Sequence, residues 1–358
     1  MITSFKIENF KGFCELELPQ LSRITLLGGS NNVGKTSVLE AIHIFLNRRS
    51  PELMTLNLQW RGKRRLSDAD VAPWLPDFHN FDTAREIVLS GAVDGKPLKM
   101  YIAHREFDLT HPIEPEAALP RYPAPPAANR GNADYPKWLD IRYITREEDP
   151  SDLIPLMLTS QARFYTDNLD IPGSPVALVG GFIEQRQELL AAMYSELDVA
   201  GKQDSVLHFL KIIEPSLKSL SVAISDGDAM IYGDTGLSRK IPVAYMGDGI
   251  SRLLTIILYM ANLPNGVVLI DEIENGLHHK VIPKVWEAIG RAAREFNCQV
   301  IATTHSFELL EDALTGLGEN YRDDFAFIRL DRRDDCVRPV RLDYEMLETA
   351  FEYHMEIR

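Results

Sequence analysis

Gly29-Ser30-Asn31-Asn32-Val33-Gly34-Lys35-Thr36 is a complete G-x-x-x-x-G-K-[ST] motif. It follows an apolar run at 23–27 that predicts a strand, and it precedes a helical pattern at 37–46. In this setting the glycines let backbone N–H groups close round phosphate oxygens, and the N-terminus of the new helix faces them. The sequence therefore predicts a phosphate-binding loop that holds a nucleotide.

The residues of this loop have separate expected roles. Lys35 should reach the β- and γ-phosphates, and the Thr36 hydroxyl should bind Mg²⁺. The chain contains no [NT]-K-x-D segment, which guanine specificity normally needs, so we expect ATP rather than GTP. The other residues of this region expected to contact ATP are Gly29, Asn31, Asn32, Val33, Gly34 and Ser37.

An apolar run at 267–270 ends in two acids, Asp271 and Glu272. A continuous apolar run is typical of a parallel strand buried on both faces, and α/β sheets place their ligands at the carboxyl ends of such strands. Asp271 is predicted to bind Mg²⁺ together with Thr36, and Glu272 to act as base for the attacking water. The alternative is a strand that ends in a solvated acidic turn, which the upstream motif disfavours.

A second apolar strand is predicted at 299–303, and Thr304-His305-Ser306 follows it. A single histidine after a strand is usually structural. Here a neutral imidazole could contact the γ-phosphate or the water, so His305 is predicted to be catalytic alongside Glu272.

A glycine-rich segment, Tyr245-Met246-Gly247-Asp248-Gly249-Ile250-Ser251-Arg252-Leu253, precedes the acid pair, and Asp271 follows Gly247 by 24 positions. Phosphate loop, glycine-rich segment, acid pair and histidine in this order resemble an ABC-type ATPase. The segment aligns on the transporter-type signature L-S-G-G-Q-x-x-R-L, but Met246, Asp248 and Gly249 replace its Ser, second Gly and Gln. The M-G-D-G-x-x-R variant is similar to stand-alone ATPases of the OLD (overcoming lysogenisation defect), AAA-15 and AAA-21 groups.

The opening segment at 5–13 also resembles the first strand of that group and of RecF- and SMC-like ATPases. The resemblance covers 1–45 and about 219–330. It implies a head-to-tail homodimer or higher oligomer, with ATP between the P-loop of one subunit and Gly247, Asp248 and Gly249 of the other. It also implies that Lys11 approaches the nucleotide, and it leaves Gln59 and Gln161 as candidates for the Q-loop residue.

The expected fold class is an α/β P-loop NTPase: an ABC-type ATPase head with a mainly parallel sheet, an antiparallel β-subdomain and a helical insertion lobe. Apolar residues at helical spacing indicate the insertion, and Asp94-Gly95 indicates a hairpin turn. The expected divisions of a single head at 1–358 are a P-loop lobe at 1–46, 83–107 and 264–343, a Pro-rich loop at 108–137, the helical insertion at about 149–217 and the signature region at 240–260.

Composition favours a soluble cytoplasmic protein. No apolar run approaches the ~18–20 residues needed to span a bilayer, and three scattered cysteines argue against a disulfide framework. The formal charge of −14 disfavours nonspecific nucleic-acid binding by the whole surface. A basic run at 61–65, with Arg48 and Arg49 nearby, leaves DNA binding through a local patch open, against the alternative of a solvated loop.

The leading functional hypothesis is an ATP-driven dimeric switch in prokaryotic DNA maintenance or anti-phage defence. Only 53 positions follow His305, too few for the Toprim nuclease domain that many OLD members carry, so a nuclease or toxic effector is expected to act in trans. One alternative is an ATP-bound scaffold or sensor that sequesters an effector with little turnover. Another is the ATPase subunit of a transporter, against which the altered signature counts.

Overall fold

The computed structural model describes residues 1–47, 74–106, 137–144, 153–156, 173–180, 187–225, 227–306, 308–334 and 336–353. The basic run at 61–65 and its neighbours Arg48 and Arg49 lie outside the described residues. The two candidate Q-loop residues and nearly all of the Pro-rich segment also lie outside them. No helix in the described ranges is long and apolar enough to cross a membrane.

The nucleotide-binding half is built on a six-stranded sheet of order β15-β14-β3-β13-β12-β8. Its strands are β3 (Ile24–Gly29), β8 (Val176–Val179), β12 (Val267–Ile270), β13 (Gln299–Thr303), β14 (Phe325–Arg333) and β15 (Cys336–Asp343). All pairs are parallel except β14–β15 at the edge. On β12, Val268 and Ile270 join one core cluster, while Val267 and Leu269 join the other. The apolar run is thus buried on both faces, as predicted.

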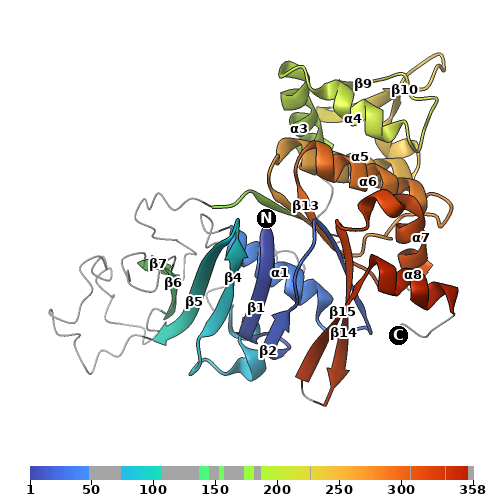
Figure 1. Cartoon of the computed structure of the whole chain (residues 1–358). Helices are drawn as coiled ribbons and strands as arrows, with labels where there is room; N and C mark the ends of the chain where they lie inside the picture. Colours follow the sequence, from blue (N-terminus) through green and yellow to red (C-terminus); the bar gives the residue numbers. More distant parts are fainter. Residues whose placement is uncertain are drawn as a thin grey trace, which may run out of the picture.

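The second six-stranded sheet is entirely antiparallel, in the order β2-β1-β4-β5-β6-β7. It contains β1 (Ile2–Phe10), β2 (Phe13–Leu18), β4 (Ile87–Val93), β5 (Lys96–Glu106), β6 (Lys137–Ile144) and β7 (Leu153–Leu156). The β4–β5 turn has Asp94 and Gly95 at φ 50° and 74°, the positive pair of a type I′ hairpin. Helix α1 (Lys35–Leu46) packs with residues of both sheets in a single core cluster, and Figure 1 shows it beside β1.

Helices cover the other face of the parallel sheet; the first four of them along the chain form the upper lobe in Figure 1, whereas the last lies lower, beside β15. They are α3 (Gln187–Val199), α4 (Gln203–Leu210), α5 (Asp248–Asn262), α6 (Ile282–Glu295), α7 (Glu308–Leu317) and α8 (Tyr344–Glu352). A three-stranded antiparallel sheet of β9 (Ser219–Ser225), β10 (Asp228–Asp234) and β11 (Ile241–Pro242) packs against α3. Helix α5 contacts α3, α4 and α6, so the helix that carries most of the signature lies at the centre of this lobe. Four short 3₁₀ turns complete the described elements: η1 (Leu75–Asp77), η2 (His79–Phe81), η3 (Val243–Tyr245) and η4 (Glu319–Tyr321).

The structure corrects the helical insertion predicted at about 149–217. Two strands lie in the first part of that range, β7 and β8, and the first helix that the structure describes there begins at Gln187. Strand β8 pairs in parallel with β12, so this segment belongs to the sheet of the P-loop lobe. A run of four apolar residues is too short to distinguish strand from helix by periodicity, and the free edge of β12 decides its conformation.

Candidate functional site

The P-loop joins β3 to α1, and its two end glycines have conformations that other residues rarely adopt. Gly29 has φ 132°, and a Cβ there would lie 2.4 Å from the Leu330 carbonyl oxygen. Gly34 has φ 105°, and its Cβ would lie 2.4 Å from the Phe13 ring. The motif glycines are therefore required by close packing on β14 and β2 as well as by the turn of the loop.

Lys35 begins α1 and points back across the loop. Its ammonium donates hydrogen bonds to the carbonyl oxygens of Gly29 at 2.7 Å and Ser30 at 3.1 Å. Burial lowers the pKa of Lys35, an effect opposed by the nearby carboxylates of Glu274, Asp271 and Glu272. A cation is thus held at the centre of the loop, where the phosphates of a nucleotide are expected.

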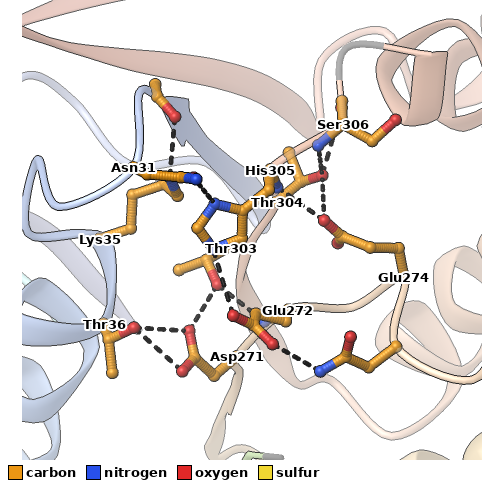
Figure 2. A network of polar contacts seen from close by, with 12 residues as sticks. Asn31, Lys35, Thr36, Asp271, Glu272, Glu274, Thr303, Thr304, His305 and Ser306 are labelled. Carbon is orange, nitrogen blue, oxygen red and sulfur yellow. Dashed lines mark hydrogen bonds and ion pairs between the residues drawn. The ribbon is translucent and has the colours of Figure 1, made fainter.

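Thr36 and Asp271 meet at the carboxyl ends of the parallel strands (Figure 2). The Thr36 hydroxyl lies 3.0 Å from Asp271 Oδ2 and 3.1 Å from Oδ1. Burial raises the pKa of Asp271, and hydrogen bonds from Thr303 and Thr36 oppose that rise. A hydroxyl and a carboxylate side by side are hard oxygen donors of the kind that Mg²⁺ takes, so these two residues fit the predicted metal site.

Glu272, His305 and Asn31 form a chain of contacts from three separate loops (Figure 2). His305 Nε2 lies 3.2 Å from Glu272 Oε1, and His305 Nδ1 lies 2.7 Å from Asn31 Oδ1. The other Glu272 oxygen accepts a hydrogen bond from Asn275 at 2.5 Å. Glu272 has φ 46°, a left-handed conformation that is uncommon outside glycine and often marks functional sites. The structure therefore brings the predicted base, the predicted histidine and the P-loop together.

Three further residues connect these groups; the sequence patterns gave no role to Thr303 or Glu274, and gave Arg252 only as the arginine of the signature. Thr303 ends β13; its hydroxyl donates to Asp271 Oδ1 at 2.6 Å and accepts from the Glu272 N–H at 2.8 Å. Glu274 accepts a hydrogen bond from the His305 backbone N–H, in the loop at 304–306 that is called the histidine loop below. The Arg252 guanidinium, on α5, donates to the carbonyl oxygens of Asp271 at 3.0 Å and Glu272 at 3.3 Å. The signal that could have pointed to Thr303 is a hydroxyl residue at the carboxyl end of a strand whose central residues are apolar.

The signature segment lies at the start of α5. Gly247 precedes the helix with φ 116°, and both it and Asp248 are exposed. Tyr245 is 78% exposed. Among the described residues, no hydrogen bond joins Gly247, Asp248 or Gly249 to the P-loop or the acid pair, and the signature helix reaches the acid pair through Arg252. The expected role of these three residues at a partner's nucleotide stays a prediction.

Lys11 lies in the turn between β1 and β2. Its ammonium forms an ion pair with Glu40, contacts Asp77 Oδ1 at 3.4 Å and lies 5.2 Å from the centre of the Phe10 ring. Both carboxylates are buried. If the ammonium moved away to contact a nucleotide, two poorly solvated charges would lose their partner, which costs free energy. The predicted contact between Lys11 and the nucleotide stays a prediction.

Two family models match the chain. Residues 148–311 match AAA_21, described as "AAA domain, putative AbiEii toxin, Type IV TA system", and residues 1–108 match AAA_15, described as "AAA ATPase domain". The chain is 22% identical over 331 residues to an ATP/GTP phosphatase of Helicobacter pylori, and this alignment covers 87% of each chain. It is 23% identical over 342 residues to the OLD nuclease of Thermus scotoductus, and this alignment covers 86% of this chain but only 59% of that nuclease.

Among solved structures, the chain resembles an SMC head bound to the C-winged helix domain of ScpA. The TM-score is 0.50 and the identity 16%, with 98% of this chain and 99% of that chain covered. This likeness confirms the expected fold class. The family matches and the geometry of the site support an ABC-type P-loop ATPase of the AAA-15/AAA-21 group.

Proposed function

We propose that this chain binds and hydrolyses ATP with Mg²⁺, and that hydrolysis drives a dimeric switch. The observation that carries the proposal is the placement of the Thr36–Asp271 pair beside the Glu272–His305 pair at the P-loop. One pair offers oxygen ligands for a metal, and the other offers a base with a polarising neighbour.

ATP binding requires Lys35 to exchange partners. Its ammonium is held by two P-loop carbonyl oxygens, and it would turn toward the β- and γ-phosphates when they enter the loop. The loop N–H groups and the N-terminus of α1 face the same phosphates. Mg²⁺, held by Thr36 and Asp271, would neutralise charge on the phosphate oxygens.

Activation of water requires Glu272 to be free. In the structure one of its oxygens contacts His305 and the other contacts Asn275. We propose that a γ-phosphate attracts the His305 ring away from Glu272, which leaves Glu272 Oε1 to accept the proton of the attacking water. The base would then act only when the bound nucleotide carries a γ-phosphate, as a nucleotide-driven switch requires.

The test is Mg²⁺-dependent ATP turnover, with ATP binding followed by calorimetry. Lys35→Ala should lose binding, because no other ammonium in the loop neutralises the phosphate charge. Asp271→Ala should lose Mg²⁺-dependent turnover. Glu272→Gln should still bind ATP, but its turnover should be at least about 10²-fold slower than that of the wild type.

Glu311→Gln, an exposed substitution on α7, is the control and should match the wild type. Tight ATP binding by Lys35→Ala, or wild-type turnover by Asp271→Ala, would contradict the assignment.

We further propose that the switch acts in prokaryotic DNA maintenance or anti-phage defence and controls a nuclease or toxic effector in trans. The support is similarity to an OLD nuclease and to a family model described with a toxin of a type IV toxin–antitoxin system. The chain spans 59% of the OLD nuclease. We expect the purified chain to leave plasmid DNA intact in ATP and Mg²⁺; cutting that survives clean purification and disappears in an acidic-residue variant would contradict an effector in trans.

The alternative function is a sensor that holds ATP and sequesters an effector with little turnover. The observation that favours it is the double engagement of Glu272, whose two oxygens are both occupied. Tight ATP binding without measurable turnover, both with and without DNA, would favour the sensor over the ATP-driven switch.

A further inference from the structure

Glu274 follows the acid pair by two positions, in the loop that leads from β12 to α6. Its Oε1 accepts a hydrogen bond from the His305 backbone N–H at 2.6 Å and another from the Thr304 hydroxyl at 3.1 Å (Figure 2). One carboxylate oxygen therefore joins the loop after β12 to the loop after β13.

The environment of Glu274 makes this contact costly to lose. Its second oxygen, Oε2, is buried and has no hydrogen-bond partner among the described residues. A buried carboxylate is poorly solvated, so its free energy depends on the hydrogen bonds and cations near it. The two loop donors supply the hydrogen bonds. The Lys35 ammonium and the Arg252 guanidinium supply the nearby positive charge, since Glu274 raises the pKa of both groups against their burial.

The contact holds the backbone from which the histidine ring projects. Thr304 Oγ1 also accepts the Ser306 N–H at 3.0 Å, so three consecutive residues of the loop are connected to the Glu274 carboxylate. His305 itself is exposed, with 37% of its side chain accessible, and among the described residues the polar contacts of its ring are those of its two nitrogens with Glu272 and Asn31. A ring in this position depends on its backbone for orientation.

We infer that Glu274 is the positioning residue for His305: its Oε1 fixes the loop at 304–306 so that the imidazole lies between Asn31 of the P-loop and Glu272. This inference deepens the proposed function and rests on it. Glu274 then acts through His305 and does not touch the reacting atoms. Glu272 and Glu274, two residues apart, thus have separate roles.

The experiment uses the full chain and compares Glu274→Gln with Glu274→Asp. The amide oxygen of Gln can accept both hydrogen bonds from the same place, whereas Asp keeps the charge but is shorter by one methylene. We expect Glu274→Gln to keep kcat within about threefold, and Glu274→Asp to lower kcat about 10²-fold, the scale of a misplaced catalytic group. The KM for ATP should change little in both variants, because the phosphate contacts remain.

Dependence on His305 is tested with a double-mutant cycle. If Glu274 acts through His305, Glu274→Asp should lower kcat in the wild-type background but produce no further loss in His305→Ala. Glu308→Gln, an exposed carboxylate on the element that follows the same loop, is the matched control and should turn over normally. Melting temperatures of all variants show whether each one is folded.

The inference is overturned if Asp is active and Gln is not, because the charge of Glu274 would then matter and its acceptor position would not. It is also overturned if the losses from Glu274→Asp and His305→Ala multiply. Failure of the proposed function has a different signature, since Lys35→Ala and Asp271→Ala would then leave ATP binding and turnover unchanged.

Discussion

Thr303 connects the two acids through a single hydroxyl, which donates to Asp271 and accepts from the Glu272 N–H. Thr303→Val has nearly the same shape but leaves the buried carboxylate and N–H without this partner. We expect turnover to fall about tenfold or more and the free energy of unfolding to fall by about 1–3 kcal/mol. Turnover assays and urea unfolding measure the two effects.

The matched control is Thr25→Val, near the amino end of the neighbouring strand β3. Thr25 is also buried, and its hydroxyl bonds the backbone of Ser22, far along β3 from the P-loop. It should lose stability to a similar extent but keep turnover. Equal turnover losses at both positions would mean that Thr303 contributes to the sheet and not specifically to the site.

At the scale of elements, the histidine loop leads into α7, and α7 packs closely on α6. The close approach is at Gly316, where a Cβ would lie 2.1 Å from the Pro283 carbonyl oxygen. Gly316→Ala therefore forces the two helices apart, and we expect the free energy of unfolding to fall by about 1–3 kcal/mol despite the better helix propensity of alanine.

Thr315→Ala is the control on the same helix, because Thr315 is exposed. It should change the free energy of unfolding by less than about 0.5 kcal/mol. Urea unfolding of both variants is the measurement, and a Gly316→Ala protein as stable as the wild type would show that α6 and α7 are not held as closely as the structure indicates.

At the scale of the whole molecule, the site has a P-loop and an acid pair on one side and an exposed glycine signature elsewhere on the same chain. Two copies related by a two-fold axis could each cover the other's nucleotide with Gly247 and the N-terminus of α5. Glu272→Gln should bind ATP without hydrolysing it and so hold the closed dimer. We expect its mass to double on addition of ATP, measured by light scattering.

Gly247→Asp in the Glu272→Gln background should abolish the increase, because it adds a second carboxylate where phosphate is expected. Gly201→Asp is the matched control: both glycines have positive φ and open space around the missing Cβ, but Gly201 lies in the turn after α3. If ATP did not change the mass, the ATP-driven dimer would be wrong, and the protein would be either a constitutive oligomer or a monomeric ATPase.

The sequence by itself determined the features that depend on neighbouring residues. The P-loop is a contiguous octapeptide, and the positive φ of its glycines is a local requirement of the turn. The strand at β12 followed from a continuous apolar run, and the β4–β5 turn from an Asp-Gly pair at positive φ. The order of motifs along the chain then indicated the fold class, because each motif implies the element that carries it.

The tertiary structure alone decided the features that depend on distant partners. β8 is a strand because β12 offers it an edge, and no periodicity in four residues could indicate that. Lys11 is bound by Glu40 and Asp77, which are 29 and 66 positions away. The contacts of Thr303 and Glu274 join loops about 30 positions apart. Side chains from separate loops meet only when the parallel strands align their carboxyl ends, so sequence patterns indicate the reacting groups but not the residues that orient them.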